Sequence, residues 1–174
     1  QDGSTHEWVP GKLWDLIVTM DDASSEHYSM FFIDEEGTQS SFQGVNEVID
    51  KHGVFASLYT DRGSHYWNTP EAGGKVDKEN LTQFGRAMRQ LGIEMIPAYS
   101  PEARGRSARA FHTHQERLVK ELALAGISEM KQAILISVMC IFPPLTMNLQ
   151  CRRVNQHVCP LGRDTSSRHP LRTI

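Results

Sequence analysis

The sequence predicts an α/β fold in which a mixed β-sheet is flanked by helices. Short apolar runs that suit buried strands alternate along the chain with stripes of apolar residues at helical spacing. The chain has 174 residues, of which 39% are hydrophobic and 22% charged, a composition typical of a globular domain with a substantial core. The predicted order is three strands, then a helix, a strand, a helix, a strand and a final helix.

The first three strands and the first helix are predicted from residues 1–53. Because the sequence begins at Gln1, we expect most of the first strand to be absent. The apolar run at 14–20 and the run at 28–33 are separated by a polar turn, which favours a hairpin. A stripe of apolar residues at helical spacing then spans 42–49, and Gly53 ends that helix.

The remaining elements are predicted between residues 54 and 126. Residues 54–59 form an apolar strand with Asp61 at its exit, and a polar stretch that contains Gly73 and Gly74 forms a loop. A helical stripe spans 81–91, a short strand follows at 93–96, and a last apolar stripe precedes Gly126. Ligands of open α/β sheets gather beyond the ends of strands, so a functional site is expected at that edge of the sheet.

Three sequence blocks stand out against this framework. Residues 14–25 read W-D-L-I-V-T-M-D-D-A-S-S, residues 58–64 read L-Y-T-D-R-G-S, and residues 100–111 read S-P-E-A-R-G-R-S-A-R-A-F. In order and in separation, these blocks resemble those of the catalytic core of DDE transposases and retroviral-type integrases. The opening Q-D-G-S-T-H-E-W is similar to a segment of the transposases of unclassified bacterial insertion sequences.

The resemblance covers residues 1–130 and implies a ribonuclease H-like fold for them, with residues 131–174 as a divergent basic tail. It also implies the ancestral reaction, which is metal-dependent DNA cleavage and strand transfer in DNA integration and transposition. In that family three carboxylates hold two divalent ions, because Mg²⁺ and Mn²⁺ prefer oxygen ligands. The catalytic and metal-binding residues carried over to this chain are Asp2 and Asp61, and Asp15 is the alternative to Asp2.

The third acidic position of the family pattern is occupied by Ala108, whose methyl group cannot bind a metal. The nearest glutamates are Glu102, before the predicted helix, and Glu116, more than two turns along it, so neither is placed to substitute. Position 108 falls ~60° from Phe111 at ~100° per residue, and we expect it to face the sheet. The sequence therefore predicts an incomplete metal site and an inactive copy of the enzyme.

Positive charge within the last two blocks predicts contact with DNA. The basic residues concerned are Arg62, Arg104, Arg106 and Arg109. Contacts from such residues to phosphates position DNA without reading its sequence. DNA is therefore the predicted partner, and recognition of its sequence would belong to a region upstream of this chain. Solvated surface arginines are the alternative interpretation.

The charge of the chain changes near residue 130. The net charge is −8 over residues 1–130 and +5 over residues 131–174. All three cysteines, Cys140, Cys151 and Cys159, lie in the second part, and their spacings do not match a zinc site. This part lacks clear periodicity, which indicates a disordered tail or a reading-frame shift, with a folded accessory segment as the alternative.

The sequence predicts the core fragment of a DNA transposase or integrase. No apolar run reaches the ~20 residues that a membrane-spanning helix needs, and no signal peptide is evident, so we expect a cytoplasmic protein without membrane contact. A second copy of the chain or an intact transposase is expected as a further partner. Two other functions stay open: a catalytically inactive module that binds DNA or pairs with a transposase, and a non-functional remnant of a mobile element.

Overall fold

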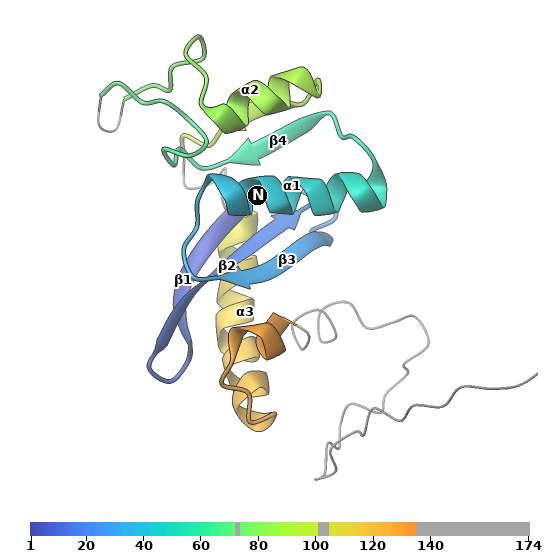
Figure 1. Cartoon of the computed structure of the whole chain (residues 1–174), viewed down its shortest axis with the longest axis vertical. Helices are drawn as coiled ribbons and strands as arrows, with labels where there is room; N and C mark the ends of the chain where they lie inside the picture. Colours follow the sequence, from blue (N-terminus) through green and yellow to red (C-terminus); the bar gives the residue numbers. More distant parts are fainter. Residues whose placement is uncertain (72–73, 101–104, 135–174) are drawn as a thin grey trace, which may run out of the picture. The chain divides into compact units, whose positions relative to one another are not determined.

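The computed structural model describes residues 1–71, 74–100 and 105–134, and it confirms the predicted order of strands and helices (Figure 1). The first three strands form an antiparallel sheet in the order β1-β2-β3. Their bounds are β1 (Asp2–Val9), β2 (Lys12–Met20) and β3 (His27–Ile33). The predicted hairpin is therefore present as β2 and β3.

The first strand differs from the expectation that most of it would be absent. β1 has eight residues, and all of its pairing with β2 involves residues from Asp2 onward, beginning with Asp2 opposite Val18. Sequence reasoning missed the extent of this strand because residues 2–7 are polar and show no apolar alternation. Hydrogen bonding to β2 stabilises the strand in place of a hydrophobic pattern, and the hydrophobic part of β1 comes only at Trp8 and Val9.

Two helices cover opposite faces of this sheet (Figure 1). α1 (Thr38–His52) packs against β2 and β3, and α3 (Gly105–Leu124) packs against β1. The predicted end of α1 is confirmed at Gly53, which has φ of 82° and donates its N–H to the carbonyl of Ile49 at 2.8 Å. Glycine suits this position because other residues rarely adopt a positive φ.

The remaining strands form a parallel pair that adjoins β1. β4 (Ser57–Thr60) pairs with β5 (Glu94–Pro97), and α2 (Gln83–Gln90) connects them. The amino group of Gln1 donates to the carbonyl of Tyr59 at 2.8 Å, so the start of β1 lies beside the end of β4. This contact brings the residues that follow β4 to the same edge as Asp2.

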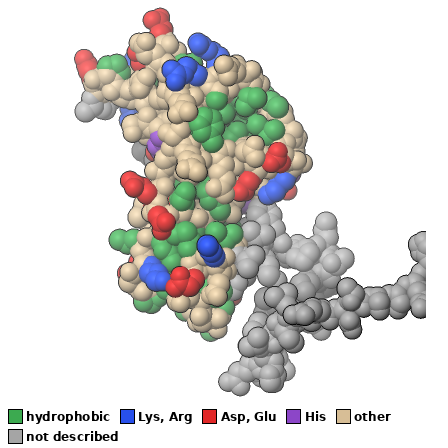
Figure 2. Space-filling view, viewed as in Figure 1, with side chains coloured by type: hydrophobic (Ala, Val, Ile, Leu, Met, Phe, Trp, Pro, Cys, Tyr) green, Lys and Arg blue, Asp and Glu red, His purple; other side chains and the backbone are tan. Residues whose placement is uncertain are grey.

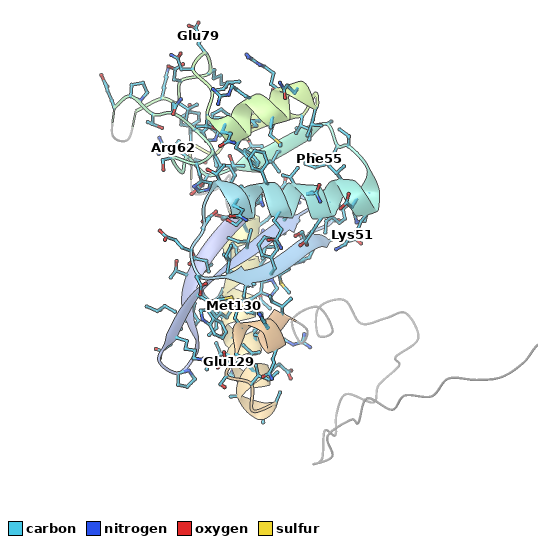
Figure 3. All side chains as sticks on the ribbon, in the orientation of Figure 1. Lys51, Phe55, Arg62, Glu79, Glu129 and Met130 are labelled. Atoms are coloured by element: carbon cyan, nitrogen blue, oxygen red, sulfur yellow. The ribbon has the colours of Figure 1, made fainter. Side chains whose placement is uncertain are left out.

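Two hydrophobic clusters hold these layers together. The first lies between the three-stranded sheet and α3 and includes Trp8, Phe32 and Leu118. It also includes Ala133, which is fully buried and lies three residues past the boundary expected at residue 130, with Met130 packed against the same cluster (Figure 3). The second cluster is built around α1, α2 and β4 and contains Tyr66, Trp67 and Phe84.

Most of the surface shown in Figure 2 mixes charged and uncharged side chains. Apolar side chains gather beside the C-terminal end of α1 and the start of β4, where Val54 is 59% exposed. Among the helices in the described ranges, none combines the length and the apolar character needed to cross a membrane. The cysteines and nearly all of the predicted basic tail lie outside the described residues.

Candidate functional site

Asp2 is the first residue of β1, and its side chain points toward α3. Side chains alternate between the two faces of a strand, and Ser4, two residues on, accepts a hydrogen bond from Gln115 of α3 at 3.0 Å. The Asp2 carboxylate is buried at 8% exposure and accepts the N–H of Gly3 at its Oδ1. Its Oδ2 accepts the hydroxyl of Ser107 at 2.9 Å, which joins the start of β1 to the start of α3.

Asp61 follows β4 directly and lies at the same edge of the fold. Its Oδ1 accepts the N–H of Gly63 at 3.0 Å, so the turn after the strand fixes the carboxylate. Asp2 and Asp61 line one small cleft of about 60 Å³, together with Tyr59 and Ser107. A space of this size holds an ion with a few water molecules, whereas a nucleotide would have to lie across its mouth. The structure thus brings the two predicted carboxylates together.

The position expected to complete this cleft does not face it. Ala108 is exposed and is not part of the cleft lining, so the expectation that it faces the sheet is wrong. The buried stripe of α3 instead runs through Phe111, His114 and Leu118, and Ser107 lies one turn before Phe111 on that stripe. Ala108 is ~100° around the helix from Ser107. The signal that could have identified Ser107 was its spacing of four residues from Phe111.

The acids around the cleft do not form a complete divalent-metal site. In residues 1–71, 74–100 and 105–134, no three Asp, Glu, His or Cys side chains converge closely enough to hold a metal ion. The cleft offers the carboxylates of Asp2 and Asp61, and its third acid, Asp22, is 78% exposed and pairs with Arg106 at 3.7 Å. The described residues therefore do not fit the three-carboxylate set that two bound ions require.

Asp15, the alternative first aspartate, lies away from the cleft. Its carboxylate is buried and accepts the hydroxyl of Thr5 and the backbone N–H of Glu36, the second at 2.6 Å. Glu36 immediately precedes the N-terminal end of α1, so Asp15 joins β1 and β2 to the start of that helix. This arrangement gives Asp15 a structural role, whereas Asp2 has a place in the cleft.

The four predicted DNA-binding arginines have different surroundings. Arg106 lines the cleft and donates to the carbonyl of Ala23 at 3.2 Å, and Arg109, one turn away, is exposed. Arg62 stands over the ring of Tyr99 at 5.3 Å and donates to the carbonyl of Gly74 at 3.0 Å, so it anchors the loop after β4 (Figure 3). Arg104 lies outside the described residues.

Two histidine contacts were not predicted from the sequence. The Nε2 atoms of His27 in β3 and His114 in α3 lie 2.9 Å apart, at hydrogen-bond distance. Burial lowers the pKa of both imidazoles, and burial together with the nearby His27 and Arg117 lowers the pKa of His114 to about 4. Both rings are therefore neutral at pH 7, and the Nε2–H of one ring donates a hydrogen bond to the Nε2 of the other.

The second contact lies beneath Asp2 on the other face of the sheet. Glu36 Oε1 is 3.4 Å from His65 Nε2, and the Glu36 carboxylate covers Gly3 so closely that a side chain at Gly3 would collide with it. Neighbouring Tyr66 is almost fully buried, which raises the pKa of its hydroxyl, and the charges of Glu36, Asp61 and Asp2 add to that shift. Half-buried Glu36 and His65 and buried Tyr66 thus lie close to the residues of the cleft.

Comparison with known proteins agrees with the geometry of the cleft. The chain is 35% identical over 133 residues to y4bF of Sinorhizobium fredii, which is named as a transposase, and 29% identical over 132 residues to the transposase for insertion sequence IS1202 of Streptococcus pneumoniae. These matches take in 74% and 76% of this chain but only 28% of each relative, so the chain spans less than a third of their length. No family model matches the chain.

Solved structures with the same fold are retroviral integrases. The catalytic core of HTLV-2 integrase, solved in complex with magnesium in a trimeric form, aligns with a TM-score of 0.60 at 17% identity and covers 85% of this chain and 87% of that one. The intasome of simian T-cell lymphotropic virus with the PP2A regulatory subunit B56 gamma gives a TM-score of 0.62 at 18% identity, over 94% and 57% of the two chains. The fold is thus ribonuclease H-like, and the chain is similar to transposases in sequence and to the catalytic cores of retroviral-type integrases in fold.

Proposed function

We propose that this chain is the core of a transposase whose ancestral reaction is cleavage of DNA and transfer of the cut strand, and that this copy is catalytically inactive. The similarity to two transposases supports the reaction class. The position of Asp2 and Asp61 in one cleft, at the ends of neighbouring strands, supports the location of the ancestral site.

The inactivity rests on one observation, which is the composition of the cleft. Mg²⁺ and Mn²⁺ need several oxygen ligands, and the two-ion arrangement of this reaction class depends on carboxylates that bridge and flank the ions. Among the described residues the cleft supplies the carboxylates of Asp2 and Asp61, while Asp22 pairs with Arg106 at 3.7 Å, and Asp2 already accepts the hydroxyl of Ser107 at 2.9 Å. With Ala108 outside the lining, α3 contributes no negative charge to the cleft.

The test compares two ways of adding the missing carboxylate. Mn²⁺ affinity is measured by calorimetry in the unmodified chain and in the variants Ser107→Glu and Ala108→Glu, with Asp61→Asn added to each as the control. We expect weak binding in the unmodified chain, a gain of about tenfold or more in at least one variant, and loss of that gain with Asp61→Asn. The stripe of α3 favours Ser107→Glu, and the family pattern favours Ala108→Glu.

DNA cleavage by the unmodified chain would contradict the proposal. The assay incubates the chain with a labelled DNA duplex and Mg²⁺ or Mn²⁺ and follows cutting of the strands. We expect none above the background set by Asp61→Asn. Cutting that requires Mg²⁺ and disappears in Asp61→Asn would show that the site is complete without a carboxylate at position 107 or 108.

The exposed arginines at the start of α3 favour a second function, which is DNA binding without cleavage. Arg106 and Arg109 are both exposed beside the cleft, and basic side chains in such a position bind phosphates irrespective of sequence. A chain of this kind would occupy DNA ends or pair with an intact transposase. Salt-dependent binding of a DNA duplex without cutting is the expected signature.

A further inference from the structure

A second hollow lies beside the cleft and shares a wall with it. Met20, Arg106 and Ala110 line both spaces. The rest of the hollow comes from the turn after β2, from β3 and from the next turn of α3, and its remaining lining residues are Ala23, Ser25, His27, Arg109, Thr113 and His114. We call this space the histidine–arginine hollow.

The turn after β2 is fastened on two sides to form one wall of the hollow. Asp21 accepts the N–H and the hydroxyl of Ser24 at 2.7 Å each, which closes the turn. Arg106 donates to the carbonyl of Ala23, and the His27 ring contacts the backbone of Ser25. The described residues thus hold this wall of the hollow by hydrogen bonds of their own.

The charge of the hollow suits an anion. Arg109 donates its Nε to the carbonyl of Gly105 at 3.1 Å, an orientation that leaves the far end of its guanidinium group for other acceptors. Arg106 adds a second guanidinium group at the wall shared with the cleft. A divalent cation would face these two positive charges with only His27 and His114 as ligands, and those two rings already hydrogen-bond each other.

We propose that the histidine–arginine hollow binds a backbone phosphate of the DNA strand that passes the cleft. This assignment rests on the proposed function, in which the chain contacts DNA. The phosphate would accept hydrogen bonds from Arg106 and Arg109, and Ser25 belongs to the same lining. Because Arg106 borders both spaces, a phosphate in the hollow would direct the neighbouring nucleotide toward Asp2 and Asp61.

The histidine pair makes this binding dependent on pH. At pH 7 burial keeps both rings neutral, and an added proton on either ring would face Arg106, Arg109 and Arg117 from α3. The acids on the adjoining turn are Asp21, Asp22 and Glu26. A phosphate in the hollow favours the protonated ring, so its affinity should rise as the pH falls from 7 toward 5.

The experiment follows the histidine ring signals by NMR in the whole chain. Inorganic phosphate is added first, and a short DNA duplex is then added to a separate sample. We expect saturable shifts of the His27 and His114 signals with both, while His112, which is 74% exposed elsewhere on α3, stays unchanged. The affinity for the duplex, whose phosphodiesters keep one negative charge over this range, should rise severalfold between pH 7 and pH 5.5.

Two matched variants locate the binding group. Arg109→Gln removes one guanidinium group from the hollow and should weaken phosphate binding about tenfold, since hydrogen bonds between charged groups are the stronger kind. Arg86→Gln removes an exposed arginine of α2 that does not line the hollow, and it should have little effect. Arg109→Gln should also lower the salt slope of DNA binding by about one.

Each failure has a different meaning. Absence of saturable shifts with phosphate, or equal phosphate affinity in Arg109→Gln, would overturn the assignment of the hollow. DNA binding that leaves both histidine signals in place would overturn the assignment while the proposed function stands. Phosphate binding in a chain that does not bind DNA would overturn the DNA assignment together with the proposed function.

Discussion

The hydroxyl of Ser107 donates a hydrogen bond to Oδ2 of Asp2 at 2.9 Å. This contact joins β1 to α3 in the lining of the cleft. It places Ser107, and not Ala108, next to the carboxylate of Asp2. A buried carboxylate needs such partners, because burial without hydrogen bonds penalises the charged form.

We predict that this hydrogen bond contributes measurably to stability. Ser107→Ala removes the donor to Asp2, and the free energy of unfolding should fall by about 1 kcal/mol, the usual contribution of one such bond. The measurement is urea unfolding of Ser107→Ala, Asp2→Asn and the double variant. A coupling energy of zero between the two positions would show that the side chains do not interact in solution.

Asp15→Asn and Asp2→Asn should differ in their effect on Mn²⁺ affinity. Asp15→Asn leaves either the Thr5 hydroxyl or the Glu36 N–H without an acceptor, and we expect a loss of about 2 kcal/mol of stability with unchanged Mn²⁺ affinity. Asp2→Asn should reduce Mn²⁺ affinity. Thermal unfolding and calorimetry on the two variants provide the check, and reduced Mn²⁺ binding in Asp15→Asn would identify it as the first aspartate.

The histidine pair predicts a loss of stability in acid. The pKa of His114 is about 4 in the folded chain, whereas an unperturbed histidine of the unfolded chain has a pKa of 6.5. Between these two values the unfolded chain binds a proton that the folded chain does not. The free energy of unfolding should therefore decrease as the pH falls from 6.5 to 4, by at most about 3 kcal/mol.

His114→Leu should reduce the decrease in the free energy of unfolding between pH 6.5 and 4, because the substituted position no longer titrates. Urea unfolding at pH 7, 5.5 and 4.5 gives the comparison, with His112→Leu as the control on an exposed position of the same helix. An equally steep loss of stability in His114→Leu would mean that other groups govern the acid response.

The arginines should contribute unequally to DNA binding. Arg106→Gln combined with Arg109→Gln should reduce the slope of log affinity against log salt by about two, since each residue would neutralise one phosphate. Arg62→Gln should change the slope by less, because Arg62 is held by Tyr99 and Gly74. Fluorescence anisotropy with a labelled duplex measures both, and a larger effect of Arg62→Gln would reverse the order inferred from the contacts.

The motif blocks and the apolar runs of the sequence predicted the position of Asp61 and most of the strands and helices. The T-D-x-G-S block located Asp61 at the exit of β4, and the apolar runs located β2, β3 and the three helices, because burial of one face imposes a period on the sequence. The first strand was missed in extent, since its stability comes from backbone pairing with β2, which leaves no apolar period in residues 2–7.

The arrangement of the cleft depended on the tertiary structure. A helical projection could not decide between positions 107 and 108, because they are ~100° apart and both border the apolar stripe of α3. The docking of α3 on β1 decides it, with Ser4 meeting Gln115 and Asp2 meeting Ser107. The sequence determined which acids this copy has and which it lacks, whereas the pairing of His27 with His114, 87 residues apart, required the packing of a helix against a sheet.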